Sequence, residues 1–327
     1  WTRVMRSIDV CNGDADGLCA VLQWRLHEPA QATLVTGLKR DIALLDRVQA
    51  HPGDEVLVCD ISMQRNRAAL VRLLEDGARV RYFDHHAAPD RPTHPNLETH
   101  IEVGAAVCTS LLMDRHLGGG FRPWALVGAY GDNLTEVADA LAEAAGLDAG
   151  SRDRLRMLGE AINYNAYGED VNDVHISPAD LYRIMARYSD PRNLIAQEPV
   201  VGELDALRRA DLESGATLAP HWENERACVV VLPDAPWSRR VIGALANRLA
   251  SAHPMRAHAV LKPVSDASFV VSVRAPLHAA GGANELCSRF GGAGRAGAAG
   301  IDRLPAIELE RFISGFSSFP FHAARGA

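Results

Sequence analysis

Short apolar runs alternate with helical repeats in the N-terminal part of the chain, and this alternation restricts the fold more than any other feature. The runs RSIDVCN, ATLVTG, DEVLVCD and ARVRYFDHH have the length and composition of strands. Between them, GLCAVLQWRLHE, DIALLDRVQA and NRAALVRLLEDG carry apolar residues at helical spacing. Strands that alternate with helices predict an α/β fold with a doubly wound parallel sheet.

A second α/β unit follows later in the chain. It is predicted from the strands RACVVVL, RAHAVLK and SFVVSVR, the helix SRRVIGALANRLA, and a glycine-rich loop, FGGAGRAGAAG, before a last helix. Residues 104–146 look helical with a break at LGGGFRP, whereas residues 150–200 are polar and hard to place. Proline and glycine between 199 and 220 indicate a boundary, so we expect a first domain over 1–198, a linker over 199–225, and a smaller second domain over 226–327.

Charge is distributed unevenly between these parts. The 327 residues carry a net charge of -7, which argues against non-specific binding to long duplex DNA. Residues 1–225 hold 22 Lys and Arg against 35 Asp and Glu, whereas residues 226–327 hold 12 against 6. An acidic first part suits metal binding and a basic second part suits an anionic ligand, although chance and solvated faces also produce such a split.

Cysteine usage and hydropathy indicate the compartment. The six cysteines show no metal-finger or redox spacing, and most lie in apolar runs, so we expect reduced core residues in a cytoplasmic protein. We expect no signal peptide and no membrane partner, because no apolar run reaches the roughly 18 residues that a span requires.

Polar side chains gather where the predicted strands end. The carboxyl ends of parallel strands meet at one edge of a sheet, where ligands bind. Several carboxylates at one edge repel each other unless a cation neutralises them, and oxygen ligands with imidazoles suit Mn²⁺ or Mg²⁺. Taken singly, DADG is a common turn, Asp60 could cap a helix, and GDN is an ordinary loop. The set consists of Asn12, Asp14, Asp16, Asp60, Asp84, His85, His86 and Asp132.

The four segments NGDADG, VCDIS, FDHH and GDN resemble the motifs of the DHH phosphoesterase superfamily, and FGGAGRAGAAG resembles the glycine-rich loop of the DHH-associated substrate domain. The resemblance covers nearly the whole chain. It implies a DHH domain with a doubly wound parallel sheet, a smaller C-terminal substrate-binding domain, and an active-site cleft between them. The length resembles most closely the compact oligoribonuclease branch.

The resemblance also implies a role for each residue. Asp14 would hold one metal ion, Asp16 the other, and Asp60 would bridge them, with two Mn²⁺ per chain expected and Mg²⁺ or Co²⁺ as alternatives. His85 and Asp132 would complete the shell of the second ion. His86 would face the scissile phosphate, and Asp84 would orient the imidazoles.

Two departures from the family pattern affect these roles. Asn12 stands where many members have His or Asp, and it can bind metal only through its amide oxygen, so the first site is expected to be weaker or filled only with substrate. In the loop, Arg295 replaces a frequent His and Ala293 a Gly. Arg295 can still hold a phosphate, but Ala293 restricts the backbone.

Substrate contacts are predicted in both parts of the chain. The glycine-rich loop could offer amide groups to an anion, or it could be a packing turn of small residues. Arg274 ends a strand and Lys39 follows one, although a solvated position is the plain alternative for each. The predicted contacts are Lys39, Arg40, Arg274, His278, Gly291, Gly292, Gly294 and Arg295.

The function predicted from these features is Mn²⁺-dependent hydrolysis of short single-stranded oligonucleotides or linear dinucleotides to mononucleotides. Alternatives within the same chemistry are a 3',5'-bisphosphonucleotide phosphatase and a cyclic-dinucleotide phosphodiesterase, while pyrophosphatase and processive action on long strands are less favoured. A nucleotide-binding protein with impaired catalysis is the alternative from another class, motivated by Asn12 and the altered loop. The oligomeric state stays open, with a homodimer considered.

Overall fold

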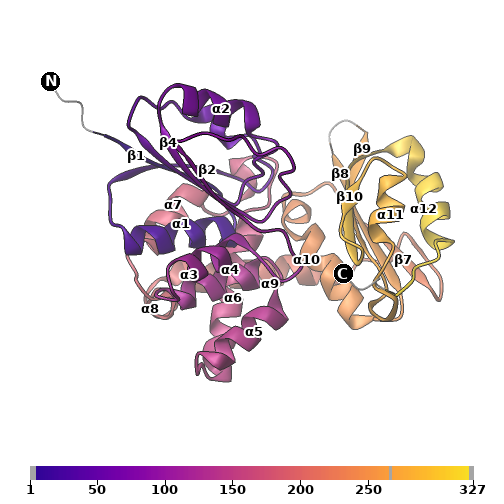
Figure 1. Cartoon of the computed structure of the whole chain (residues 1–327). Coiled ribbons are helices and arrows are strands. Elements are labelled where there is room, and N and C mark those ends of the chain that lie inside the picture. Colours follow the sequence, from indigo (N-terminus) through magenta and orange to yellow (C-terminus); the bar gives the residue numbers. More distant parts are fainter. Residues whose placement is uncertain (1–4, 265–266, 324–327) are drawn as a thin grey trace. The chain divides into compact units, whose positions relative to one another are not determined.

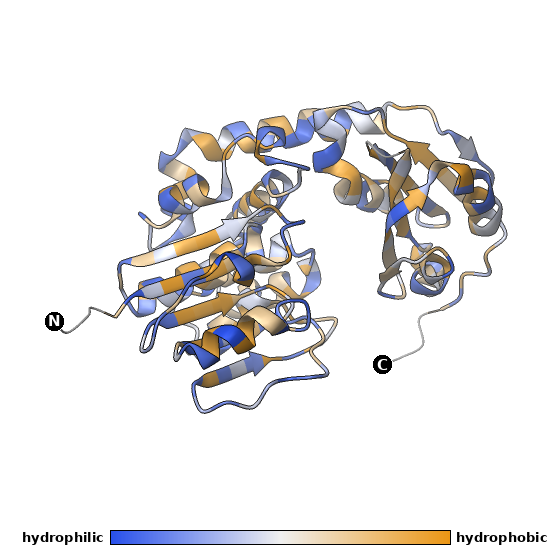
Figure 2. Cartoon of the chain, turned by 90° about the horizontal axis from the view of Figure 1, so that it is seen from above, coloured by the Kyte–Doolittle hydropathy of each residue, from blue (hydrophilic) through white to orange (hydrophobic). Residues whose placement is uncertain are grey.

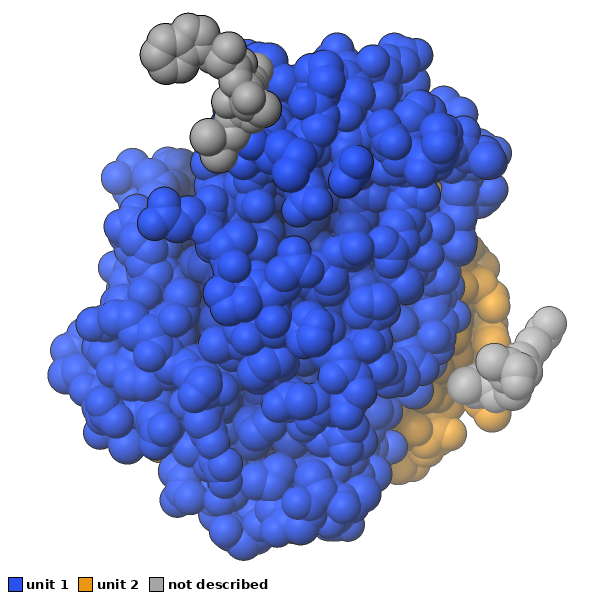
Figure 3. Space-filling view, turned by 60° about the vertical axis from the view of Figure 1, so that its left-hand side comes forward, with its two compact units in different colours: residues 1–206 blue, residues 207–327 orange. Residues whose placement is uncertain are grey.

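The computed structural model describes residues 5–264 and 267–323, and the chain divides into two compact units, 1–206 and 207–327 (Figure 3). The first unit is built on a five-stranded sheet with the order β2-β1-β3-β4-β5, in which every neighbouring pair is parallel. The predicted doubly wound parallel sheet is therefore confirmed. Its strands are β1 (Ser7–Asn12), β2 (Ala32–Gly37), β3 (Glu55–Cys59), β4 (Arg79–Asp84) and β5 (Leu97–Ile101).

Both faces of this sheet are buried, because alternate strand residues on each face are apolar. On β3, Leu57 and Cys59 pack into one hydrophobic cluster while Val56 and Val58 pack into another on the opposite face. Figure 1 shows α2 on one side of the sheet and α1, α3 and α4 on the other. This unit contains the helices α1 (Ala15–His27), α2 (Arg67–Glu75), α3 (Thr109–His116), α4 (Arg122–Gly131), α5 (Thr135–Ala144), α6 (Ala149–Asn165), α7 (Pro178–Met185) and α8 (Pro191–Gln197).

The prediction of a helix over DIALLDRVQA is wrong. Only a short 3₁₀ turn forms there, over Leu44–Arg47. The Asn66 side chain accepts a hydrogen bond from the Leu45 amide at 3.2 Å and donates one to the Ile42 carbonyl at 2.7 Å. These bonds from a distant side chain replace the helical pattern that the apolar spacing predicted.

The second unit is a mixed sheet with the order β10-β11-β9-β8-β7-β6, in which only β7 and β8 are parallel. The smaller α/β unit predicted from the sequence is therefore confirmed, and its strands are predominantly hydrophobic (Figure 2). Its strands are β6 (Trp222–Glu223), β7 (Ala227–Val231), β8 (Ala257–Val264), β9 (Ser268–Arg274), β10 (Ala293–Gly294) and β11 (Ala298–Pro305), and its helices α10 (Pro236–Ala252), α11 (Ala283–Ser288) and α12 (Leu309–Ser317).

The stretch expected as a linker, 199–225, contains helix α9 (Pro199–Ala216) and strand β6. The division between the two compact units falls inside α9, after Ala206. All six cysteines are buried and free. None of the described helices combines the length and apolar character that crossing a membrane requires.

Candidate metal centre

Three neighbouring strands and the end of helix α4, where Asp132 lies, bring the predicted acidic and imidazole groups to one edge of the sheet. Strands β1, β3 and β4 lie side by side, with Cys11 opposite Cys59 and Cys59 opposite Phe83. The residues that follow these positions are therefore neighbours at the carboxyl edge. Asp60 has φ of 57° and is 3% exposed, a left-handed conformation that is uncommon for a residue other than glycine and that often marks a functional site.

Asp16 is held by the amino end of another helix. Its two carboxylate oxygens accept hydrogen bonds from the backbone amides of Thr109 and Ser110, each at 2.7 Å, where α3 begins. Amides at a helix amino end stabilise a negative charge. The Thr109 hydroxyl also donates to Asp60 Oδ1 at 3.3 Å. Thr109 and Ser110 were missed by sequence reasoning, since CTSLL carries no signal beyond a helix start.

His85 is oriented with one ring nitrogen toward the carboxylates. Its Nδ1 donates to the Val107 carbonyl at 3.1 Å, while its Nε2 lies 3.2 Å from Asp60 Oδ1 and 4.0 Å from Asp16 Oδ2. Burial alone would lower the pKa of His85, but the hydrogen bond to Asp60 and the charge of Asp16 raise it to about 10. A backbone carbonyl that fixes one ring nitrogen and leaves the other among carboxylates is typical of a metal-ligating histidine.

Asp84 and His86 form a second oriented pair. Asp84 is fully buried, and its Oδ1 accepts hydrogen bonds from His86 Nδ1 at 2.7 Å and from the His85 amide at 2.9 Å. The His86 side chain is 47% exposed, so its Nε2 edge is reachable from solvent. Asp84 therefore fixes the His86 ring, and the predicted catalytic roles of the two residues stay predictions.

Two of the carboxyl groups near His85 have raised pKa values. Burial, reinforced by the charges of Asp14 and Asp16, raises the pKa of Asp60 well above its ordinary value. Burial likewise raises the pKa of Asp132 to about 6, and its buried Oδ2 has no hydrogen-bond partner among the described residues. Ligand atoms of Asp16, His85 and Asp132 lie within 4.8 Å of one another.

A second group of ligand atoms within the same 4.8 Å limit joins Asp60, His85 and His86. The donor set is thus mostly carboxylate oxygen with one or two imidazoles, and it leaves an orphaned oxygen on Asp132. Both features fit a divalent cation such as Mn²⁺ or Mg²⁺. The structure brings together the side chains of Asp16, Asp60, His85, His86 and Asp132, and metal binding by them stays a prediction.

Asp14 has a different environment, because it already faces a cation of the chain. Lys39 Nζ lies 2.5 Å from Asp14 Oδ2 and 3.5 Å from Asn163 Oδ1. Burial would raise the pKa of Asp14, but the Lys39 ammonium outweighs it and holds that pKa below its ordinary value. Asn12 Oδ1 accepts a hydrogen bond from the Asp14 amide at 3.2 Å. Lys39 was predicted as a substrate contact, and its partner in the structure is an acidic residue of the site.

The other predicted substrate contacts have structural partners. Arg40 is exposed and donates to the Glu169 carbonyl at 3.4 Å. Arg274 Nε donates to Asn247 Oδ1 at 2.5 Å, and its Nη1 donates to Ser272 Oγ at 3.0 Å. Substrate binding by these side chains stays a prediction.

The glycine-rich loop is a hairpin between β10 and β11. A Cβ on Gly292 would lie 2.2 Å from the Gly300 carbonyl oxygen, and one on Gly294 would lie 2.4 Å from the Ala299 Cα, so close packing requires glycine at both positions. Gly291 has φ of 75°. These contacts support the packing-turn alternative, while anion binding by the loop and by exposed Arg295 stays a prediction.

His278 is exposed in a short 3₁₀ turn after β9. It lines a cavity of about 320 Å³ within the second unit, together with Arg226 and the aromatic residues Phe316, Phe319 and Phe321. Contact between His278 and a terminal phosphate of the substrate stays a prediction.

Similarity to known proteins is found by comparison of structures and not by comparison of sequences. No family model matches the sequence, and no curated protein matches it. Among solved structures, the chain is similar to the exonuclease RecJ bound to manganese, with a TM-score of 0.60 and 19% identity over 97% of this chain and 91% of that one.

Two further structures agree with this result. RecJ from Thermus thermophilus in complex with Mn²⁺ gives a TM-score of 0.62 and 20% identity. The match covers 98% of this chain and 53% of that longer protein. A pGpG-specific phosphodiesterase, PggH from Vibrio cholerae, gives 0.53 and 15% identity over 94% of this chain and 96% of that one. The chain therefore shares the fold of these structures and of a protein described as a DHH domain, in agreement with the fold that its four motifs predicted.

Proposed function

We propose that the chain is a divalent-metal-dependent phosphoesterase that hydrolyses phosphodiester bonds in short oligonucleotides or linear dinucleotides. The observation that carries the proposal is the set of buried carboxylates gathered around His85 with an unpartnered oxygen on Asp132. Such a set is costly without a cation and well suited to one. The fold shared with manganese-bound RecJ and with PggH supports the same class of reaction.

The residues of the site divide the work between metal binding and substrate handling. Asp16, Asp60, His85 and Asp132 would hold the ion, which supplies Lewis-acid activation of water and of the phosphate when bound. His86, fixed through its Nδ1 by Asp84, would direct its Nε2 to a phosphate oxygen or to the leaving oxygen. Asp84 acts by holding the ring in that orientation.

The number of ions is a separate part of the proposal. A second Mn²⁺, as expected from the family resemblance, would bind at Asp14 with Asn12 and share Asp60. In the structure Lys39 lies on Asp14, and Asn12 contributes no charge. The second ion would therefore have to displace Lys39, or bind together with a substrate phosphate that draws Lys39 away. A metal count with and without nucleotide separates these two cases.

Substrate choice is proposed from the same comparison. Short RNAs of two to five residues and linear dinucleotides are the leading class, because PggH is described as specific for pGpG. The alternatives are 3',5'-bisphosphonucleotides, cyclic dinucleotides, and nucleotide binding without turnover. Manganese, a soluble cytoplasmic location and action on single strands belong to this proposal.

The experiment is a rate comparison on purified protein. Labelled two- to five-residue RNAs, pGpG, a cyclic dinucleotide and a bisphosphonucleotide would each be incubated with Mn²⁺, Mg²⁺ or a chelator. We expect mononucleotides from the short linear substrates with Mn²⁺ and none with the chelator. Asp60→Ala is the matched inactive control. Nucleotide binding without product under every divalent metal would replace this proposal with the binding-protein alternative.

A further inference from the structure

A group of side chains outside the carboxylate site has the composition of a metal centre. Glu98 and His100 lie two residues apart on β5, so both project from the same face of this edge strand. His116 is the last residue of α3. One ligand atom from each of these three residues lies within 4.8 Å of the others.

The three side chains are held in place by their neighbours. The His100 ring stacks on Phe83 with a centroid distance of 4.4 Å and an interplanar angle of 9°, and its Nε2 donates to Glu98 Oε1 at 2.6 Å. The His116 ring lies 4.6 Å from His100 and 5.1 Å from Phe83. Because Phe83 supports both rings, little ordering is needed before a ligand binds.

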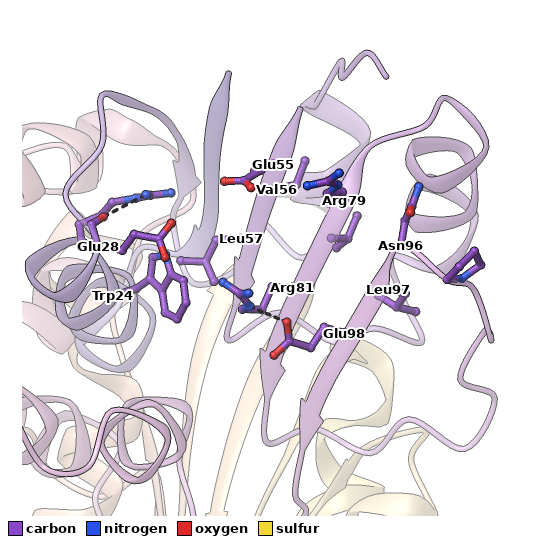
Figure 4. Close-up of a pocket in the computed structure, with 13 residues that line it drawn as sticks. Trp24, Glu28, Glu55, Val56, Leu57, Arg79, Arg81, Asn96, Leu97 and Glu98 are labelled. Carbon is purple, nitrogen blue, oxygen red and sulfur yellow. Dashed lines mark hydrogen bonds and ion pairs between the residues drawn. The ribbon is translucent and has the colours of Figure 1, made fainter. Parts of the chain in front are cut away.

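Glu98 is oriented from its other side. Its Oε2 accepts from Arg81 Nε at 2.8 Å, which leaves Oε1 facing His100. Figure 4 shows Arg81 and Glu98 directed at each other from neighbouring strands, on the face where Trp24 lies. Arg81 thus fixes the carboxylate through Oε2, and the contact of Oε1 with His100 is the one that an ion would replace.

Two helix carboxyl ends add negative partial charge beside the group, in which Arg81 already pairs with Glu98. Helix α1 ends at His27 and α3 at His116, and the Trp24 ring lies 6.0 Å from each of these two rings, so the negative carboxyl ends of both helices are close to the group. The Glu98 and His100 side chains are 46% and 31% exposed, so an ion can reach them.

We propose that Glu98, His100 and His116 form a second metal site that takes a zinc-class transition ion, with two imidazoles, one carboxylate and an open fourth position for water. Two nitrogens and one oxygen suit Zn²⁺, Co²⁺ or Ni²⁺ better than Mn²⁺ or Mg²⁺. The ion would join the edge strand β5 to the carboxyl end of α3. The amino end of the same helix holds Asp16, so the ion would fix a helix that also positions the carboxylate site.

The test measures zinc binding where the carboxylate site is disabled. In an Asp60→Asn background, isothermal titration should show one Zn²⁺ bound per chain, and Co²⁺ should give the visible absorption of a tetrahedral ion. His116→Ala and His100→Ala should each weaken this binding by on the order of 100-fold or abolish it. His221→Ala, which removes an exposed histidine of the second unit, is the matched control and should bind as the background does.

Two further measurements keep the test decisive. Circular dichroism of the metal-free variants should match the background, and zinc should raise the melting temperature only where all three ligands are present. If a histidine variant fails to fold, Glu98→Gln gives the same comparison. Equal zinc affinity in the background and in the three ligand variants would overturn the proposal, as would a background that takes up no zinc. The result is independent of whether the carboxylate site hydrolyses phosphodiesters.

Discussion

Buried carboxylates have opposite surroundings at the two edges of the parallel sheet. At the amino edge, Asp54 accepts hydrogen bonds from Arg6 Nη2 at 2.6 Å and Nε at 3.0 Å, and from the backbone amides of Arg6 and His51. At the carboxyl edge, Asp60 and Asp132 are buried beside other acids.

The pKa values show the same contrast. Burial would raise the pKa of Asp54, but Arg6 outweighs it and holds that pKa at about 2, whereas burial raises the pKa of Asp132 to about 6. A carboxylate that the chain neutralises by itself serves the fold. At the carboxyl edge, Asp132 Oδ2 has no hydrogen-bond partner among the described residues, so it is available to a ligand, and the surrounding side chains suit a cation.

Turnover should distinguish the two edges most strongly when Asp60 at the carboxyl edge and Asp54 at the amino edge are each substituted. Asp60→Ala should lower Mn²⁺-dependent turnover on a short RNA by on the order of 1,000-fold, because a lost metal ligand removes several kcal/mol of transition-state stabilisation. Asp54→Asn should keep its turnover at a temperature where it is folded. Steady-state rates of both variants check this, and wild-type turnover in Asp60→Ala would move the site elsewhere.

The stability of the metal-free protein should depend on pH with opposite signs at the two edges. Asp132 has a folded pKa above its unfolded value, so the folded state binds the extra proton and stability falls as pH rises from about 4 to 6. Above pH 6, Asp132→Asn should therefore raise the free energy of unfolding by on the order of 3 kcal/mol. Urea unfolding of chelated protein from pH 4 to 8 measures this, and a variant less stable than wild type above pH 6 would contradict it.

Asp54 should show the reverse dependence with a smaller amplitude. Its folded pKa lies below the unfolded value, so its contribution is present above about pH 4 and is lost as pH falls toward 2. Asp54→Asn should cost about 1–2 kcal/mol at neutral pH, a figure reduced for solvent screening because Arg6 is 43% exposed. The same unfolding series is the measurement, and a loss that persists unchanged at pH 2 would show that packing rather than charge is involved.

The smallest expected effect concerns the Asp14–Lys39 pair. At this point of the carboxyl edge, as at Asp54 of the amino edge, a cation of the chain neutralises the carboxylate. Lys39→Met removes the cation next to Asp14. We expect metal analysis without nucleotide to rise from one Mn²⁺ per chain toward two. Arg40→Met, which changes a neighbouring exposed cation, is the control. An unchanged count in Lys39→Met would show that Asn12, and not Lys39, limits the first site.

The sequence predicted the parts of this site that depend on strand ends. Asp60 directly follows an apolar run and His85 follows another after Asp84, and both could be placed because parallel strands bring such ends together. The Lys39–Asp14 pair and the Thr109 and Ser110 amides on Asp16 could not be placed, since they depend on how distant segments pack.

The missed elements have similar causes. Strand β5, LETHI, has three consecutive polar residues and therefore shows no strand periodicity, so only its pairing with β4 reveals it. Helix α6 is 17 residues long, but its polar composition hides its buried face. The Asn66 side chain prevented the helix expected over DIALLDRVQA. In each case tertiary contacts decided what local pattern left open.

Anomalous diffraction from crystals grown with Mn²⁺ tests the central claim most directly. We expect a manganese peak within bonding distance of Asp16, Asp60, His85 and Asp132, with His85 Nε2 turned to the ion and away from its 3.2 Å contact with Asp60 Oδ1. A map with no peak at this edge, and with His85 still bonded to Asp60 at saturating Mn²⁺, would contradict the account.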